Sequence, residues 1–302
     1  MLLHGHLENG ADKNPNLPFS EFEGNSLSYQ EADLLSNQLA NKLVSEGLEV
    51  GDRFAFLAKN CTEMAIMYYA ASKVGAVPVP LNYRLADQEW AYIINDSEAK
   101  LIIVRGNEYS DRINQISSEL KNIKKYISIS LDNSIEKFHD FYDWLSDSSN
   151  EKPTLKIHEN DDVYQMYTSG TTGHPKGAVL LQRNVAANIR QYLNSLTLPR
   201  PSRTLLVAPM YHAAAMINMC GCIAIGGTIV IQEDFIPQDV VDCLANEKIT
   251  HTVLVPAMIQ ACLVSVPNVA SNEYNDLDQI HYGASPIAPE TLKKAMDVFK
   301  CK

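Results

Sequence analysis

The chain has 302 residues, enough to bury a substantial hydrophobic core as one large domain or two closely packed subdomains. Its 46% hydrophobic and 20% charged content excludes an intrinsically disordered chain. Its formal net charge of −11 offers no broad basic surface to neutralise nucleic-acid phosphates, so we expect no nucleic-acid partner.

The N-terminal segment and the cysteines indicate the cellular compartment. The first residues, MLLHGHLENGADKNPNLPF, lack the positive start and continuous apolar core of an export signal. The six cysteines have no paired spacing, and Cys220 and Cys222 have no second Cys or His pair at ligand spacing, which favours buried thiols over a zinc site. We therefore expect a cytoplasmic protein without a metal cluster.

Signals for helices and strands alternate along the first hundred residues. Ser28–Glu31 forms a capping box, and leucines at helical spacing follow it as far as Gly47, which predicts an amphipathic helix. The later elements in chain order are a strand over 54–58, a helix over 62–74, the strand VPVPL, a helix over 88–95 and the strand AKLIIV. Short apolar strands separated by helices are typical of a mostly parallel sheet covered on both faces, so we predict an α/β fold.

Two further stretches bear on domain organisation. Over residues 131–162 the pattern loosens into a segment rich in Asp, Ser, Asn and Glu, the one candidate for a subdomain boundary. The stretch 205–231 contains no Asp, Glu, Lys or Arg and is long enough to span a bilayer. Because Pro209 and Gly226 interrupt it, we interpret it as a buried strand, helix and strand rather than a transmembrane segment.

The segment TSGTTGHPKG, residues 168–177, combines three glycines and four hydroxyl side chains with one lysine. Glycine permits backbone conformations closed to other residues and lets main-chain N–H groups approach an anion closely. The hydroxyls add donors, and Lys176 adds a positive charge. The segment is therefore suited to binding phosphate.

Two known nucleotide-binding patterns and a plain surface turn compete with this interpretation. The P-loop of nucleoside triphosphatases requires Gly-Lys-Ser/Thr, whereas here Pro175 precedes Lys176 and Gly177 follows it. The stretch GTTG does not satisfy the dinucleotide fingerprint G-x-G-x-x-G. Ten specified positions ending in Pro-Lys-Gly favour a dedicated phosphate loop over a flexible turn.

Residues 167–177, YTSGTTGHPKG, resemble the signature loop of the AMP-forming adenylate-forming superfamily, which includes acyl-CoA synthetases, luciferases and peptide-synthetase adenylation domains. Further segments resemble that family in the same order: KVGAVPVPLNYRL (73–85), WAYIINDSEAKLIIV (90–104), APMYH (208–212) and HYGASPI (281–287). The resemblance runs from about Leu27 to the end of the chain. It implies the large N-terminal domain of the adenylate-forming fold, with residues 1–302 as one AMP-binding domain.

The resemblance implies a two-step reaction that uses ATP, Mg²⁺ and coenzyme A. A carboxylate attacks the α-phosphorus of ATP to give acyl-AMP and pyrophosphate, and a thiol, usually that of coenzyme A, then takes the acyl group. The residues implied to bind the β- and γ-phosphates are Thr168, Ser169, Gly170, Thr171, Thr172, Gly173 and Lys176. Of these, Lys176 and Thr168 are implied to act in catalysis, with the Thr168 hydroxyl near Mg²⁺.

The resemblance also assigns two later segments. The adenine site is implied to consist of Gly283, Ala284, Ser285 and Pro286, which by residue type alone indicate a strand-ending turn. Tyr211 and His212 are implied to line the acyl pocket, whereas a lone His beside a Tyr is more often a hydrogen-bonded core residue. No Asp or Glu lies between Arg203 and Gln232 to pair with an α-ammonium group, which favours a simple carboxylic acid over an amino acid.

The leading hypothesis is an AMP-forming acyl-CoA synthetase of fatty acid metabolism, that is, a carboxylic acid:CoA ligase. Two alternatives stay open. One is an adenylation domain that loads the phosphopantetheine thiol of a carrier protein, and the other is a noncatalytic module that keeps the fold as a nucleotide- or partner-binding surface. The apolar residues Met216, Ile217 and Met219 line either a fatty-acid tunnel or ordinary core.

The sequence departs from the family pattern in two respects. Gln182 stands where many members carry His in the context Thr-His-Arg-Asn. The chain stops at Lys302, before the segments that supply a Mg²⁺-binding Glu, a ribose-binding Asp and a C-terminal lid domain with a catalytic Lys. We therefore expect either a fragment of an acyl-CoA synthetase without its lid domain or the product of a degraded gene.

The 302-residue chain alone is predicted to be inactive, because an ATP site without a ribose anchor and a lid binds weakly and stays open to water. The measurement is acid-dependent exchange of labelled pyrophosphate into ATP by the purified chain. No exchange above background is expected, and detectable exchange would refute the prediction.

Overall fold

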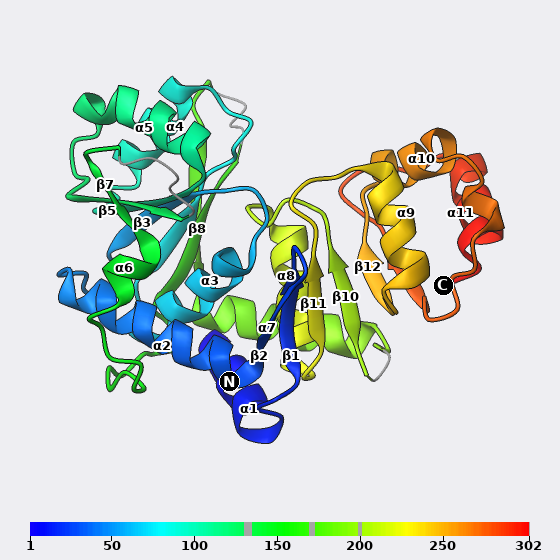
Figure 1. Ribbon diagram of the computed structural model, residues 1–302, viewed down its shortest axis with the longest axis horizontal. Helices are drawn as coiled ribbons and strands as arrows, with labels where there is room; N and C mark the ends of the chain where they lie inside the picture. Colours follow the sequence, from blue (N-terminus) through cyan, green and yellow to red (C-terminus); the bar gives the residue numbers. More distant parts are fainter. Residues whose placement is uncertain (130–134, 169–172, 199–200, 302) are drawn as a thin grey trace. The chain divides into compact units, whose positions relative to one another are not determined.

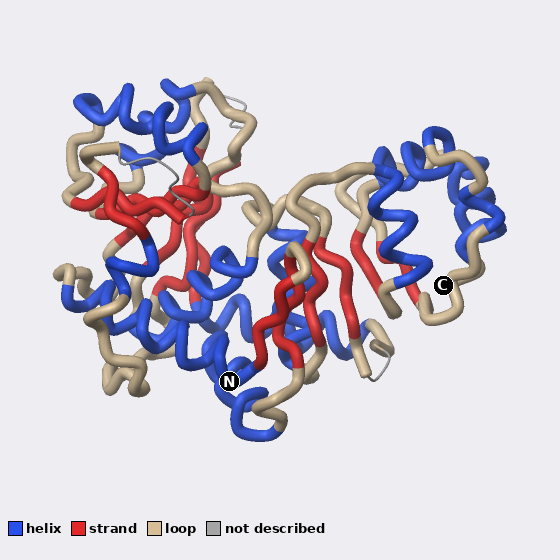
Figure 2. The backbone as a smooth tube through the Cα atoms, in the orientation of Figure 1, coloured by secondary structure: helices blue, strands red, loops and turns tan. Residues whose placement is uncertain are grey.

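The computed structural model describes residues 1–129, 135–168, 173–198 and 201–301, and the chain forms two compact units (Figure 1). Unit 1 comprises residues 1–8, 30–59 and 63–187, and unit 2 comprises residues 9–29, 60–62 and 188–302. Each unit is built around a largely parallel sheet, and the strands of both are seen in red in Figure 2. The segment 131–162, considered above as a possible boundary, falls inside unit 1.

The main sheet of unit 1 has five parallel strands in the order β4-β3-β5-β6-β7. The strands are β3 (Arg53–Leu57), β4 (Val77–Pro80), β5 (Leu101–Arg105), β6 (Lys125–Ile129) and β7 (Phe138–Asp140). The helices that accompany it are α2 (Tyr29–Ser45), α3 (Thr62–Val74), α4 (Asp87–Asp96), α5 (Asn107–Ile116), the 3₁₀ turn η1 (Ser117–Glu119) and α6 (Phe141–Leu145). Every residue of β4 is buried, as expected for a strand with both faces covered by helices, so the predicted α/β fold is confirmed.

Two antiparallel strands, β8 (Asp162–Thr168) and β9 (Lys176–Leu181), form a separate hairpin in unit 1. The buried part of β8 packs through Tyr164, whose ring makes an edge-to-face contact with Tyr68 of α3 at a centroid distance of 5.9 Å. The chain passes from β9 directly into α7 (Gln182–Ser195), and α1 (Leu3–Lys13) precedes all of these elements. The hairpin is therefore anchored at its base by the core of unit 1.

The sheet of unit 2 has six strands in the order β13-β12-β10-β11-β1-β2. All neighbours are parallel except β2, which returns antiparallel to β1. The strands are β1 (Pro18–Phe22), β2 (Asn25–Ser28), β10 (Arg203–Leu206), β11 (Thr228–Ile231), β12 (His251–Val253) and β13 (Gln279–His281). The helices are α8 (Ala213–Ala224), α9 (Pro237–Asn246), α10 (Pro256–Ser265), the 3₁₀ turn η2 (Val269–Ser271) and α11 (Pro289–Phe299).

The uncharged stretch 205–231 forms β10, α8 and β11, which confirms the predicted strand, helix and strand. Across the described residues, none of the helices combines the length and apolar character that a membrane span requires. Cys220 and Cys222 of α8 are buried free thiols, and burial raises the pKa of the Cys222 thiol to about 12. Cys222 therefore stays protonated at neutral pH and packs as an apolar residue.

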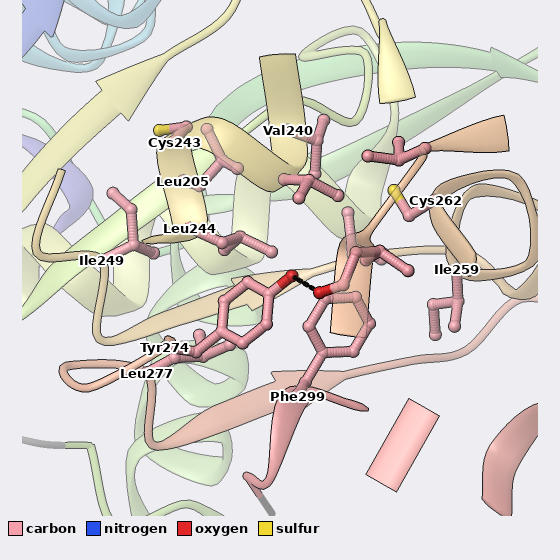
Figure 3. Close-up of a cluster of buried hydrophobic side chains, with 14 of the residues drawn as sticks. Leu205, Val240, Cys243, Leu244, Ile249, Ile259, Cys262, Tyr274, Leu277 and Phe299 are labelled. Carbon is pink, nitrogen blue, oxygen red and sulfur yellow. Dashed lines mark hydrogen bonds between the residues drawn. The ribbon is translucent and has the colours of Figure 1, made fainter. Parts of the chain in front are cut away.

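A hydrophobic cluster in unit 2 packs side chains of α9, α10 and α11 together with Leu205 of β10 (Figures 1 and 3). The side chains drawn and named in Figure 3 are Leu205, Val240, Cys243, Leu244, Ile249, Ile259, Cys262, Tyr274, Leu277 and Phe299. The buried Tyr274 hydroxyl donates to the Val269 carbonyl oxygen at 2.8 Å, which compensates the loss of water from that polar group. The cluster thereby positions the segments that precede and follow β13.

Truncation of the cluster should destabilise unit 2. Leu244→Ala is expected to lower the free energy of unfolding by about 2–5 kcal/mol, because Leu244 is 1% exposed and the cavity left behind does not collapse fully. The control Val264→Ala lies on α10 with 66% of its side chain exposed and should change the free energy by less than about 0.5 kcal/mol. Urea denaturation measures both values, and equal effects of the two substitutions would contradict this account of the core.

Candidate functional site

The register of the hairpin places two of the predicted phosphate-binding residues opposite each other. Thr168 at the end of β8 pairs with Lys176 at the start of β9. Side chains of directly opposed residues lie on the same face of an antiparallel pair, and both of these side chains are exposed. A hydroxyl and an ammonium group therefore lie on one face at the end of the hairpin where β8 ends and β9 begins. Ser169, Gly170, Thr171 and Thr172 lie outside the described residues.

Two glycines of this segment meet different steric demands. Gly173 has a φ of +100°, in the region that side-chain-bearing residues rarely adopt. At Gly177 an added Cβ would lie 2.2 Å from Gln165 Nε2 and 2.8 Å from the Cζ atom of Tyr167. Gly173 thus allows a backbone conformation that other residues rarely adopt. Gly177 leaves space for two side chains of the facing strand.

Gln182, which stands where many family members carry His, has a structural role in unit 1. Its side chain is fully buried, and its Nε2 donates to Ser72 Oγ at 2.8 Å. Its Oε1 accepts from the backbone N–H of Leu3 at 3.2 Å. Gln182 therefore links α7 to α3 and to the first turn of α1.

The turn with the four predicted adenine-site residues directly follows β13 in unit 2. Gly283, Ala284, Ser285 and Pro286 are all exposed. Ala284 has a φ of +67°, a left-handed conformation that costs a non-glycine residue about 1 kcal/mol. Strain of this kind is concentrated at functional sites, and this turn lies at the carboxyl end of a parallel strand, where α/β sheets bind ligands.

Tyr211 and His212, the predicted acyl-pocket residues, lie between β10 and α8. The Tyr211 side chain is buried, His212 is exposed, and their ring centroids are 4.3 Å apart. Since β10, β12 and β13 are parallel neighbours, this segment and the turn after β13 meet the same edge of the sheet, separated by one strand. That separation corresponds to roughly 10 Å between the strands.

The structure thus brings Tyr211, His212 and the turn 283–286 to one sheet edge in unit 2. Thr168 and Lys176 lie opposite each other in unit 1, and Gly173 belongs to the same unit.

Asn60 is a positioning residue of this edge that the sequence reasoning missed. The side chain is 2% exposed, and its Oδ1 accepts from the Met210 backbone N–H at 2.8 Å. Its Nδ2 lies 3.1 Å from both the Ala208 and the Gln232 carbonyl oxygens. Asn60 therefore fixes the segment that precedes Tyr211. Its place two residues after the apolar run FAFLA is the local signal for it in the sequence.

A buried polar chain adjoins the turn after β13. It runs from Gln279 through His281 and Tyr192 to Asn218 and Thr204, with successive distances of 2.8, 3.2, 2.9 and 2.8 Å. The ring of Tyr192 lies against Gly221 of α8, where a Cβ would come within 2.5 Å of it. Burial lowers the pKa of His281, so its imidazole is neutral at neutral pH.

His251 of β12 is fully buried next to this chain. Its Nδ1 lies 3.1 Å from Thr250 Oγ1, and its Nε2 has no hydrogen-bond partner among the described residues. Burial, reinforced by nearby His281, lowers the pKa of His251 to about 3. Protonation of this ring is therefore strongly disfavoured in the folded state.

Comparison with known proteins adds independent findings. A family profile described as AMP-binding enzyme matches residues 7–302. The long-chain-fatty-acid–CoA ligase FadD13 of Mycobacterium tuberculosis is 30% identical over 269 residues, 89% of this chain and 52% of that protein. The fatty acid–[acyl-carrier-protein] ligase ScoC of Streptomyces coeruleorubidus is 30% identical over 300 residues, 97% of this chain and 55% of that protein.

A solved structure shows the same fold. The inhibitor-bound crystal structure of the N-terminal domain of FACL13 from Mycobacterium tuberculosis superposes with a TM-score of 0.88 at 26% identity, covering 97% of this chain and 72% of that chain. The present chain spans about half the length of the two curated relatives, 52% of one and 55% of the other.

Because burial lowers the pKa of His251, we expect the folded chain to lose stability in acid. An unfolded His titrates near pH 6.5 and the folded one near 3, so between these values the unfolded state binds more protons and stability falls as pH falls. His251→Asn should reduce this dependence by up to about 1.4 kcal/mol per pH unit, or about 2 kcal/mol between pH 6.5 and 5.

Urea denaturation at pH 6.5 and pH 5 measures the effect. The exposed His139→Asn serves as the matched control and should follow the wild-type dependence. An unchanged pH dependence in His251→Asn would show that this imidazole does not cause the acid sensitivity.

Proposed function

The chain belongs to the AMP-binding enzyme family, and on that premise we propose that it is the ATP-binding part of an AMP-forming carboxylic acid:CoA ligase. The observation that carries the proposal is the exposed pair of Thr168 and Lys176, at the end of the glycine-containing hairpin where β8 ends and β9 begins. A hydroxyl donor and a cation on one face form the kind of site that binds the tail of a triphosphate.

The proposed chemistry begins with attack of a carboxylate oxygen on the α-phosphorus of ATP. The bond between the α-phosphorus and the oxygen that bridges to the β-phosphate breaks. Pyrophosphate leaves with increased negative charge. Lys176 and the hydroxyl of Thr168 are proposed to stabilise this developing charge. The residues proposed to complete the phosphate site are Ser169, Gly170, Thr171, Thr172 and Gly173.

The donor set at the hairpin fits Mg²⁺ as a partner of the nucleotide. Mg²⁺ prefers oxygen ligands and is usually held by one or two protein groups together with phosphates and water. The Thr168 hydroxyl is such an oxygen, and none of the described residues form a cluster of three His, Cys, Asp or Glu suited to a metal. Thr168 would therefore hold Mg²⁺ jointly with the phosphates, where the ion offsets phosphate charge.

In unit 2 we propose that Gly283, Ala284, Ser285 and Pro286 bind adenine and that Tyr211 and His212 line the acyl pocket. Their common sheet edge and the strained Ala284 support this assignment. The segment between Arg203 and Gln232 has no carboxylate for an α-ammonium group, and FadD13 and ScoC are named for fatty acids. A fatty acid is therefore the proposed substrate class.

Coenzyme A is the proposed acyl acceptor. The carrier-protein thiol is the second candidate, since ScoC is as similar to this chain as FadD13 is, at 30% identity. A comparison of acyl transfer to free coenzyme A and to carrier protein separates the two acceptors.

The proposed phosphate site is tested by Lys176→Ala. Loss of a charged hydrogen-bond partner costs about 1.5–3 kcal/mol, so the Kd for MgATP should rise about 10- to 150-fold while the Kd for adenosine, which lacks phosphates, changes little. Lys156→Ala removes another exposed lysine of unit 1 and should stay within about twofold of wild type. Isothermal titration calorimetry gives these constants. Equal MgATP affinity in Lys176→Ala and wild type would contradict the site.

The same titration distinguishes a ligase from a noncatalytic nucleotide-binding module. In a ligase, a carboxylic acid binds next to ATP, so a series of acids from acetate to palmitate should contain members that change the Kd for MgATP. A noncatalytic module would bind MgATP identically in the presence of every acid.

A further inference from the structure

Resting on the proposed function, we infer that Asp96 of α4 is a positioning residue for the phosphate-binding hairpin and acts through Tyr167. The Tyr167 hydroxyl donates to Asp96 Oδ2 at 2.6 Å. Tyr167 immediately precedes Thr168, and its cross-strand partner Gly177 immediately follows Lys176. The hydrogen bond therefore fixes the hairpin at the residue pair next to the two proposed phosphate ligands, Thr168 and Lys176.

Tyr167 belongs to a line of polar contacts along one face of β8. Gln165 and Tyr167 are two residues apart, so their side chains share that face, and Gln165 Nε2 donates to the Tyr167 hydroxyl oxygen at 3.1 Å. Arg53 of β3 donates from Nε to Gln165 Oε1 at 3.2 Å. The Arg53 Nη2 is also 3.2 Å from Asp162 Oδ2 at the start of β8. The line runs from the base of the hairpin to Asp96.

Gly177 is a requirement of this arrangement. The side chains of Gln165 and Tyr167 occupy the space that a Cβ at position 177 would need. The glycine next to Lys176 therefore lets the Tyr167 ring lie across the hairpin and reach α4. Because Thr168 follows Tyr167 in the strand, its side chain points to the opposite face, where it is left exposed together with Lys176.

A second contact joins α4 to the other side of the loop. The ring of Tyr92 stacks on His174, with centroids 4.9 Å apart and planes inclined by 23°. The Tyr92 hydroxyl lies 3.5 Å from Asp96 Oδ1, one helical turn away. His174 is two residues before Lys176. Helix α4 therefore contacts Tyr167, which precedes Thr168, and His174, which precedes Lys176.

The electrostatics of these groups agree with a donor role for the tyrosines. Burial and the hydrogen bond to Asp96 raise the pKa of Tyr167, and burial and nearby Asp96 raise the pKa of Tyr92. Both phenols therefore stay protonated and can donate to the carboxylate. A carboxylate repels a triphosphate, so Asp96 contributes through the hairpin rather than through contact with the nucleotide.

The physical reason for such a tether lies in the cost of fixing the ligand-binding side chains when the nucleotide binds. A two-stranded hairpin is marginally stable on its own, and every group that binding must order reduces affinity. Fixing Tyr167 in advance limits the conformations of Thr168 and Lys176 before the nucleotide arrives. Loss of the tether should weaken phosphate binding without affecting the adenine turn of unit 2.

The test compares Tyr167→Phe, Asp96→Ala and Asp96→Asn with the control Tyr142→Phe. The control removes a hydroxyl of the same kind, which donates to Glu63 Oε1 at 2.7 Å elsewhere in unit 1. Two readouts are used: hydrogen–deuterium exchange of peptides covering residues 165–178, and the Kd values for MgATP and adenosine.

Tyr167→Phe and Asp96→Ala should accelerate exchange in the hairpin and weaken MgATP binding about three- to tenfold, with the Kd for adenosine unchanged. Asp96→Asn keeps an acceptor oxygen and should restore near wild-type behaviour. The double variant Tyr167→Phe/Asp96→Ala should be no worse than either single variant, because both remove the same interaction. Tyr142→Phe should match wild type in exchange of residues 165–178.

Unchanged hairpin exchange in both Tyr167→Phe and Asp96→Ala overturns the inference, as does an effect equal to that of Tyr142→Phe. A wild-type chain that does not bind MgATP overturns the proposed function instead. Even then the exchange data test whether Asp96 holds the hairpin through Tyr167. Faster exchange confined to residues 165–178 in Tyr167→Phe and Asp96→Ala supports this role, and a uniform change across the chain contradicts it.

Discussion

The antiparallel register of β8 and β9 is the constraint on which the proposed site depends. It sets Thr168 opposite Lys176 and Tyr167 opposite Gly177, so the two proposed phosphate ligands share one face while the phenol of Tyr167 occupies the other. A slip of β9 by one residue would turn the Lys176 ammonium to the face that the Tyr167 phenol occupies and separate it from Thr168. The small size of Gly177 and the packing of Tyr164 on Tyr68 both favour the observed register.

Unit 2 meets a different requirement, the alignment of several loops along one sheet edge. Parallel strands bring the segment before α8 and the turn after β13 to the same side of the sheet, and the buried cluster around Leu244 and Phe299 holds the helices that lead into and out of β13. Asn60 then fixes the backbone before Tyr211 with two hydrogen bonds and joins it to the Gln232 carbonyl oxygen with a third. The unit thereby presents its proposed adenine and acyl residues on a rigid support.

Local patterns in the sequence predicted the elements whose signals are local. Helical leucine spacing and a capping box predicted α2, and proline and glycine breaks predicted the strand, helix and strand over 205–231. The phosphate-binding role of 168–177, inferred from residue type, stays a prediction. Contacts between distant residues were not predictable in this way. Tyr167 and Asp96 are 71 residues apart and Met210 and Asn60 are 150 apart, and no periodicity relates them. The pairing of β1 with β11 was missed for the same reason.

The most direct test of the central claim is a crystal structure of this chain with Mg²⁺ and a nonhydrolysable ATP analogue. The account predicts that the β- and γ-phosphates lie within hydrogen-bond distance of Lys176 Nζ and Thr168 Oγ1, with Tyr167 still bonded to Asp96. A nucleotide bound elsewhere, with Lys176 extended into solvent, would contradict it.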